Sequence, residues 1–95
     1  MNFLPGDRLH GGDERTIGIR PADLLLSDTG ALTAQVSQVE QLGGDTNVIA
    51  HVQDHQITAR LFGQHAIQAG HTVRLSFDAA KTYAFDRDGH RVATQ

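Results

Sequence analysis

Apolar and polar residues alternate along most of this chain, and glycine and aspartate clusters interrupt the alternation at short intervals. An alternation with a period of two places every second side chain on the same face of an extended strand. Short alternating runs bounded by Gly and Asp turns are typical of antiparallel sheets. The pattern therefore predicts an all-β domain with about seven or eight short strands.

The first third of the chain contains short apolar segments separated by turn residues. The short segments cover residues 3–6, 15–20 and 24–26, with a loop expected at residues 11–13 and a turn at residues 27–30. In the second segment Ile17 and Ile19 fall on one face. That segment ends in Arg20-Pro21, where proline cannot donate a hydrogen bond to a ladder and biases the preceding arginine toward an extended backbone.

The longest expected strand begins at Leu32. Leu32, Ala34 and Val36 share one face, but Val39 has the opposite parity. Keeping the apolar side chains on one face requires one extra residue near Ser37-Gln38, which is the signature of a β-bulge. The alternative is two strand segments of unrelated register. A bulge would let the strand curl and serve two sheets, as a small barrel requires.

A turn at residues 43–45, which contains Gly43, leads into two further strands. Asp54-His55 is predicted to be the two-residue loop of the hairpin between them. The expected core residues of the two strands are Val48, Ala50, Val52, Ile57, Ala59 and Leu61. Ile49 and Phe62 fall on the opposite face and are expected to be exposed, either in an interface or on plain surface, and Phe62 is a candidate interface residue. The alternative is that the barrel has a second apolar layer, in which case both belong to the core.

The last third of the chain is expected to contain one helical turn and the remaining strands. Residues 64–69 could form that turn, with Gly70 as its C-cap. One strand is expected where the apolar residues Val73, Leu75 and Phe77 alternate with polar ones. A second is expected at residues 81–85, with Tyr83 and Phe85 on one face. A turn at residues 86–89 would then lead to a last short strand at residues 91–92. The complete pattern predicts a small OB-like barrel of short antiparallel strands with at most one helical turn.

Composition narrows the possible functions. The 95 residues are enough for a single domain, residues 1–95, with one modest core. The net charge of −3 and the scarcity of aromatic residues argue against a nucleic-acid partner. No apolar run approaches the roughly 20 residues that span a bilayer, and the amino end does not resemble a signal peptide. The absence of cysteine excludes disulfides, thiolate metal sites and cysteine nucleophiles, and the chain is expected to be intracellular.

No pattern in the sequence predicts a catalytic, cofactor or metal site. The six histidines lack metal-ligand spacing, since His51 and His55 fall on a strand and on its turn. Asp86 and Asp88 lie in an Asp-Gly turn without the remainder of a calcium loop. The nucleophile elbow G-x-S-x-G and the phosphate-binding loops G-x-x-x-x-G-K-[ST] and G-x-G-x-x-G are all absent. Enzyme activity of this chain alone is therefore not expected.

Four segments together resemble a known family: residues 18–23 (GIRPAD), 39–46 (VEQLGGDT), 70–78 (GHTVRLSFD) and 85–92 (FDRDGHRV). They are similar to the transport-associated OB-type (TOBE) domain, found at the carboxy terminus of the ATP-binding subunits of ABC importers for maltose, glycerol 3-phosphate and related solutes. The resemblance covers essentially the whole chain in order. Ala22 departs from the acidic residue common in the family, which leaves the fold expectation intact.

The resemblance implies that this chain is a carboxy-terminal fragment of a longer ATPase subunit, with residues 1–6 as the junction to the ATPase domain. It implies a regulatory and dimerisation domain, with ATP and magnesium bound by the upstream ATPase domain. The implied partners are that ATPase domain, a second copy of the subunit, the permease subunits and regulatory proteins. The implied location is the cytoplasm, on the inner face of the cell membrane.

The resemblance and the turn chemistry together nominate structural or interface residues rather than catalytic ones. These are Gly18, Arg20, Pro21, Asp23, Gly43 and Phe62. Gly18 would permit a close approach of the backbone, and Arg20 would pair with a carboxylate or carbonyl. Asp23 is the nearest candidate in sequence, and a residue of a second subunit is the alternative. The alternative function is a free-standing OB-type module that binds an oligosaccharide or oxyanion on its barrel face.

Overall fold

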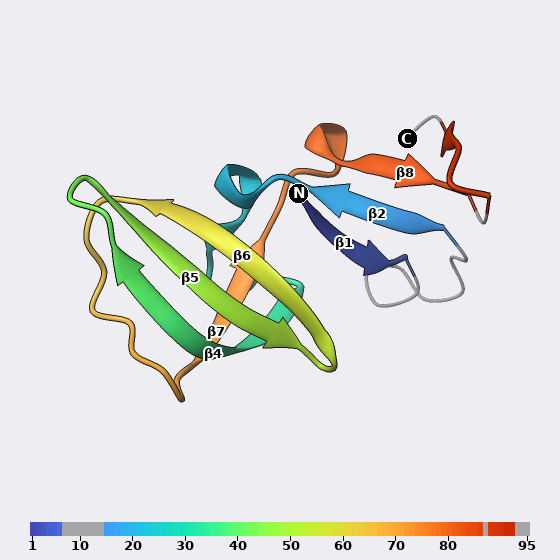
Figure 1. Ribbon diagram of the computed structural model, residues 1–95. Coiled ribbons are helices and arrows are strands. Elements are labelled where there is room, and N and C mark those ends of the chain that lie inside the picture. The colour runs from blue at the N-terminus through green and yellow to red at the C-terminus, as the bar shows by residue number, and fades with distance from the viewer. Residues whose placement is uncertain (7–14, 87, 93–95) are drawn as a thin grey trace.

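The structure, a computed structural model, describes residues 1–6, 15–86 and 88–92 (Figure 1). Its described part forms two antiparallel sheets, which lie at opposite ends of an elongated molecule of 38 × 23 × 23 Å. The four-stranded sheet has the order β1 (Asn2–Pro5), β2 (Thr16–Ile19), β8 (Tyr83–Phe85), β9 (Arg91–Val92). The five-stranded sheet has the order β3 (Leu25–Leu26), β7 (Thr72–Ser76), β4 (Leu32–Gln41), β5 (Asp45–Val52), β6 (His55–Phe62).

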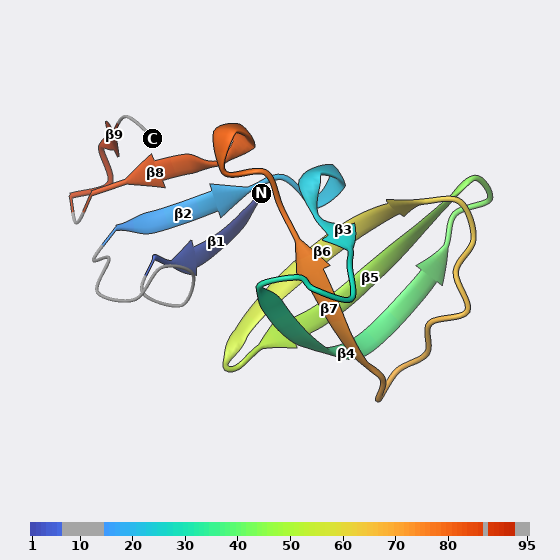
Figure 2. The ribbon, with the colours of Figure 1, turned by 180° about the vertical axis from the view of Figure 1, so that it is seen from behind.

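The five-stranded sheet curls on itself. Its two outer strands, β3 and β6, contact each other, and the short 3-10 turn η1 (Pro21–Asp23) also packs on β6 (Figure 2). A second 3-10 turn, η2 (Ala79–Lys81), precedes β8. The observed fold is therefore an all-β, OB-like barrel, as the alternation predicted.

The bulge predicted in the long strand is present. Val36 pairs with Ala50 and Gln38 pairs with Ile49, so Ser37 is the extra residue in β4. The Ser37 hydroxyl donates to the Ile49 carbonyl over 3.0 Å, which holds the irregular step in place. The bulge restores Val39 to the core side, where it packs partly buried against the core. The alternative of two unrelated registers is therefore wrong.

One hydrophobic cluster runs through both sheets. The six core residues predicted for β5 and β6 are all buried, and Leu4, Ile17, Ile19 and Ala84 extend the cluster into the four-stranded sheet. Ile49 lies on the outer face as predicted, but it is half-buried rather than exposed. The loop expected at residues 11–13 lies outside the described residues.

Asn2 joins the two sheets. Its side chain is 7% exposed and makes two hydrogen bonds to the backbone of Thr58 on the free edge of β6. The amide nitrogen donates to the Thr58 carbonyl and the Thr58 N–H donates to Asn2 Oδ1, each over 2.7 Å. The side-chain amide thus replaces a neighbouring strand at that position and satisfies both backbone groups.

Gly30 lies where two segments of backbone come into close contact. It ends the predicted turn at residues 27–30, in which its N–H donates to the Ser27 carbonyl over 3.0 Å. A Cβ atom at position 30 would lie 2.4 Å from the Leu75 carbonyl oxygen and 2.9 Å from the Leu75 nitrogen. Only glycine fits this contact between the turn and β7 without moving backbone.

The prediction of a helical turn at residues 64–69 is wrong. The segment is irregular, and its carbonyl and side-chain groups bond to distant parts of the chain. Gln41 Nε2 donates to the His65 carbonyl, and Gln64 Nε2 donates to the Gly43 carbonyl, both over 3.2 Å. Gly70 is the third residue of a turn, with φ of +92°, rather than a helix C-cap.

The strand expected at residues 81–85 begins two residues later than predicted. Lys81 belongs to η2, whose N-cap is the Asp78 carboxylate, and β8 begins at Tyr83.

The β5–β6 hairpin loop is Gln53-Asp54, one residue earlier than predicted. Val52 pairs with His55 across the loop. Gln53 has φ of +58° and is the one non-glycine residue with a positive φ in the described ranges. A two-residue hairpin loop requires a positive φ at its first position, and here a glutamine adopts it.

Replacing Gln53 by glycine is expected to stabilise the domain. Glycine reaches positive φ without the steric cost that a β-carbon imposes, so the free energy of unfolding should rise by about 0.5–1 kcal/mol. Chemical denaturation measures this change. The same substitution at Gln56, an exposed position within β6, should instead destabilise the domain, because glycine weakens a strand interior. A loss of stability in the Gln53 variant would contradict the assigned turn.

Candidate functional site

The outer face of the four-stranded sheet carries most of the aromatic side chains. Phe3 pairs with Gly18, and Gly18 pairs with Tyr83, so these three residues form one row across β1, β2 and β8. Thr16 and Phe85 form the next row. The residues between them on each strand point into the core, so the outer face combines aromatic rings with a few polar groups.

Two arginines flank Tyr83 on this face, and we name the three residues the arginine–tyrosine cluster. Arg20 Nη2 donates a hydrogen bond to the Tyr83 hydroxyl, and its guanidinium carbon lies 5.3 Å from the ring centroid. The guanidinium carbon of Arg91 lies 4.5 Å from the same centroid. Both distances fall within the range of cation–π attraction, so Tyr83 holds two positive charges close together at the surface.

The backbone around Pro21 fixes the position of Arg20. Pro21 is the first residue of η1, and Arg20 before it is extended, with φ of −68° and ψ of 144°. The Asp23 N–H donates to the Arg20 carbonyl over 2.9 Å, which closes the turn. The extended conformation predicted for Arg20 is thus present, but its side-chain partner in the described structure is Tyr83 rather than Asp23.

Gly18 gives space to side chains rather than to backbone. A Cβ atom at this position would lie 2.6 Å from Met1 Sδ and 3.4 Å from a ring carbon of Phe85. The end of β2 and the start of η1 hold four of the nominated residues, as their proximity in the sequence indicated. These are Gly18, Arg20, Pro21 and Asp23. Met1 and Phe85 were not anticipated as their neighbours, because those contacts depend on the pairing of β1 and β8 with β2.

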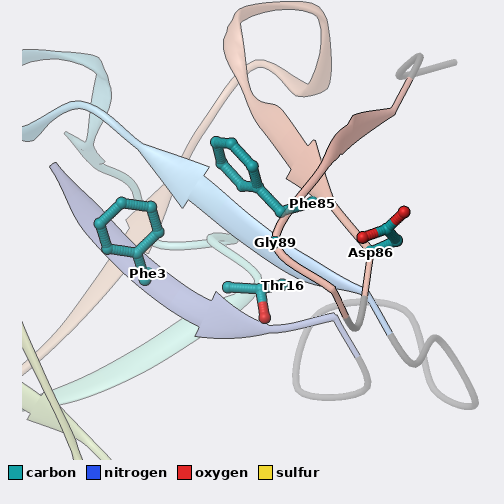
Figure 3. Close-up of a pocket in the computed structure, with 5 residues that line it drawn as sticks. All are labelled: Phe3, Thr16, Phe85, Asp86 and Gly89. Atoms are coloured by element: carbon teal, nitrogen blue, oxygen red, sulfur yellow. The ribbon is translucent and has the colours of Figure 1, made fainter.

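A cavity of about 410 Å³ opens on the outer face beside the arginine–tyrosine cluster. We call it the aromatic cleft. Among the described residues it is lined by Phe3, Thr16, Phe85, Asp86 and Gly89 (Figure 3). The two phenylalanine rings pack edge to face, with centroids 5.9 Å apart and an interplanar angle of 62°. Figure 3 shows the two rings toward one side, Asp86 toward the other side, and Thr16 of β2 lower in the view.

Asp86 is held by the turn that follows β8. Its Oδ1 accepts hydrogen bonds from the backbone N–H groups of Asp88 and His90, each over 2.9 Å. Its Oδ2 lies 3.7 Å from His90 Nδ1. Asp86, Asp88 and His90 bring possible metal-ligand atoms within 4.8 Å of one another. The hydrogen bonds to Oδ1 are those of an Asp-led turn, so the turn accounts for the cluster without a metal ion.

Gly43 and Phe62 lie together at the opposite end of the barrel (Figure 1). Gly43 has φ of +84° in the turn between β4 and β5, and Asp45, directly after that turn, pairs with Phe62. The Phe62 side chain is 77% exposed, and Leu42 beside the turn is also exposed. The six nominated residues thus form two groups, one at the end of β2 and one at the far end of the barrel. Within the described chain, no helix is long and apolar enough to cross a membrane.

Comparison with known proteins relates the chain to transport proteins. The family model described as the TOBE domain matches residues 17–85, from β2 to β8. The lactose transport ATP-binding protein LacK of Rhizobium radiobacter is 33% identical over 86 residues, which cover 86% of this chain and 24% of that protein. The sn-glycerol-3-phosphate import ATP-binding protein UgpC of Ruegeria sp. (strain TM1040) is 32% identical over an alignment of 112 positions, which covers 98% of this chain and 32% of that protein. The chain therefore spans 24% to 32% of the length of these relatives.

Proposed function

The chain belongs to the TOBE domain family, and we propose that it works as a module of the ATP-binding subunit of an ABC importer for sugars or related solutes. The observation that carries the proposal is the match of the TOBE family model over residues 17–85. The similarity to two ATP-binding import proteins supports it. In such a subunit this chain would follow the ATPase domain, with residues 1–6 as the junction.

The proposed module has no catalytic role of its own. The sequence contains no phosphate-binding loop of the form G-x-x-x-x-G-K-[ST], so ATP and magnesium would be bound by the ATPase domain of the same polypeptide. Hydrolysis in that domain would drive import through permease subunits. The subunit would act in the cytoplasm, at the inner face of the membrane.

The module would regulate the transporter and hold two ATP-binding subunits together. The far end of the barrel is the surface that best fits contact with a second copy. Phe62 and Leu42 expose apolar side chains there, next to the turn at Gly43, whose φ is +84°. Exposed large apolar residues at the centre of a patch are typical of interfaces between proteins. Regulatory proteins could dock on the remaining exterior of the barrel.

Replacing Phe62 by serine is expected to weaken self-association of the chain at least tenfold. The substitution removes the most exposed large apolar side chain of the described structure, and buried aromatic anchors commonly contribute most of the binding free energy at an interface. Sedimentation equilibrium measures the association constant directly.

The matched control is Leu25→Ser, which removes an apolar side chain of 54% exposure from β3, on another part of the barrel. The control should associate as the unmodified chain does. An unchanged association constant in the Phe62 variant would remove the far end of the barrel from the dimer contact.

A further inference from the structure

The aromatic cleft lies apart from the surface assigned above to self-association. Its lining residues come from β1, β2, β8 and the turn after β8, whereas Phe62 lies at the far end of the barrel. Its volume of about 410 Å³ falls within the usual range of small-molecule sites. We propose that this cleft binds an uncharged polyhydroxylated molecule, such as the ring of a sugar. The proposal does not depend on the importer function.

One wall of the cleft is aromatic and open to solvent. Phe3 is 54% exposed although it packs against Phe85, so the ring pair offers apolar surface to a ligand. Aromatic faces carry negative charge density and attract weakly positive C–H groups. A sugar ring has one such face of carbon-bound hydrogens, and its hydroxyl groups point outward from the ring edge. The ring pair would therefore contact the carbon face.

The other wall offers groups that bind hydroxyls. Hydrogen bonds to Oδ1 fix the Asp86 carboxylate, while its Oδ2 lies beyond hydrogen-bond distance of the nearest histidine nitrogen. That oxygen can accept a hydrogen bond from a ligand hydroxyl, and a bond to a charged acceptor is stronger than a neutral one. The Thr16 hydroxyl can both donate and accept. A carboxylate that is held in place before binding requires little ordering when the ligand arrives.

The charges around the cleft favour a ligand without net charge. Asp86 and Asp88 lie at one side, and the arginines of the arginine–tyrosine cluster lie on the same outer face around Tyr83. These opposite charges partly offset one another: an anion drawn to Arg20 and Arg91 is repelled by the carboxylates, and a cation drawn to the carboxylates is repelled by the arginines. A neutral molecule with hydroxyl donors and acceptors is compatible with both sets of groups.

The test is a titration of the ¹⁵N-labelled chain with maltose and with sucrose, followed by two-dimensional NMR. Sodium phosphate and choline chloride serve as the anionic and cationic probes. At least one sugar is expected to cause saturable shifts of the amide signals of Phe3, Thr16, Phe85 and Gly89, and the two ions are not.

Asp86→Asn is expected to weaken sugar binding about tenfold, because the amide keeps an oxygen for the turn but loses the charged acceptor. Asp28→Asn, at an exposed carboxylate on the barrel, is the control and should bind as the unmodified chain does. If the Asp86 variant does not fold, Thr16→Val removes the other hydroxyl-binding group without changing side-chain shape. The absence of saturable shifts with both sugars, shifts that map outside the cleft, or stronger binding of phosphate or choline would each overturn the proposal.

Discussion

Replacing Gly30 by alanine is expected to lower the free energy of unfolding by about 3 kcal/mol, because the new methyl group cannot be placed without moving backbone. The β-carbon would lie 2.4 Å from the Leu75 carbonyl oxygen and 2.5 Å from its carbon. These atoms belong to β7, which pairs with both β3 and β4 in the barrel sheet. Relief of the contact would therefore disturb two strand pairings. Thermal unfolding should begin more than about 10 °C lower, since small domains lose several degrees per kcal/mol.

The matched control is Gly44→Ala. No atom lies within 4 Å of a Cβ atom at Gly44, and its φ is not positive. This variant should unfold within about 0.5 kcal/mol of the unmodified chain, as surface substitutions usually do. Equal stability of the two alanine variants would show that the turn at Gly30 does not pack on Leu75 as described.

Replacing Asn2 by leucine is expected to cost about 2 kcal/mol of stability, the second largest loss foreseen. Leucine has a similar shape but can neither donate nor accept, so it would fill the site and leave the Thr58 N–H and carbonyl without partners. The substitution would weaken the contact between the two sheets, because in the described structure no other side chain is seen to hydrogen-bond the Thr58 backbone at the edge of β6.

Amide hydrogen exchange distinguishes this local effect from general destabilisation. Exchange at the Thr58 amide should accelerate more than exchange at Ile57, whose neighbours in the β5–β6 ladder are unchanged. Asn47→Leu, at the other asparagine of the sequence, is half-buried within β5 and should have little effect on either measure. Unchanged protection of Thr58 in the Asn2 variant would refute the sheet-to-sheet contact.

Parity within a strand was enough to predict the bulge and the barrel core. The opposite parity of Val39 relative to Leu32, Ala34 and Val36 requires an extra residue, and Ser37 supplies it. Burial of apolar side chains on one face is a strong constraint, because a slip of one residue exposes the whole set.

The same parity could not fix the hairpin loop. The observed register pairs Val52 with His55, and the expected loop would have paired Val52 with Ile57. Both registers keep the apolar residues of β5 and β6 on the core side, because they differ by two residues rather than one. The choice depends on whether Gln53 adopts a positive φ, which the identity of that residue does not indicate.

The contacts between segments that lie far apart in the chain could not be predicted from the sequence. Tyr83 lies 63 residues from Arg20, and Thr58 lies 56 residues from Asn2. The aromatic cleft likewise combines strands from both ends of the chain. Neither periodicity nor turn chemistry specifies which strands pair, so the sequence could indicate only Asp23, which is near in sequence, or a residue of another subunit as the partner of Arg20. The exposed position of Phe62 could be predicted, since it depends only on alternation within β6.

We propose that this chain is one module of an importer's ATP-binding subunit. The most direct test is the size of the native gene product, measured by mass spectrometry after capture from the source cells with an antibody against the barrel. We expect a polypeptide several times larger than 10.3 kDa, with a G-x-x-x-x-G-K-[ST] phosphate-binding loop upstream of residues 1–95. A native product of about 10 kDa, without that loop, would contradict the claim and favour a free-standing OB-type module.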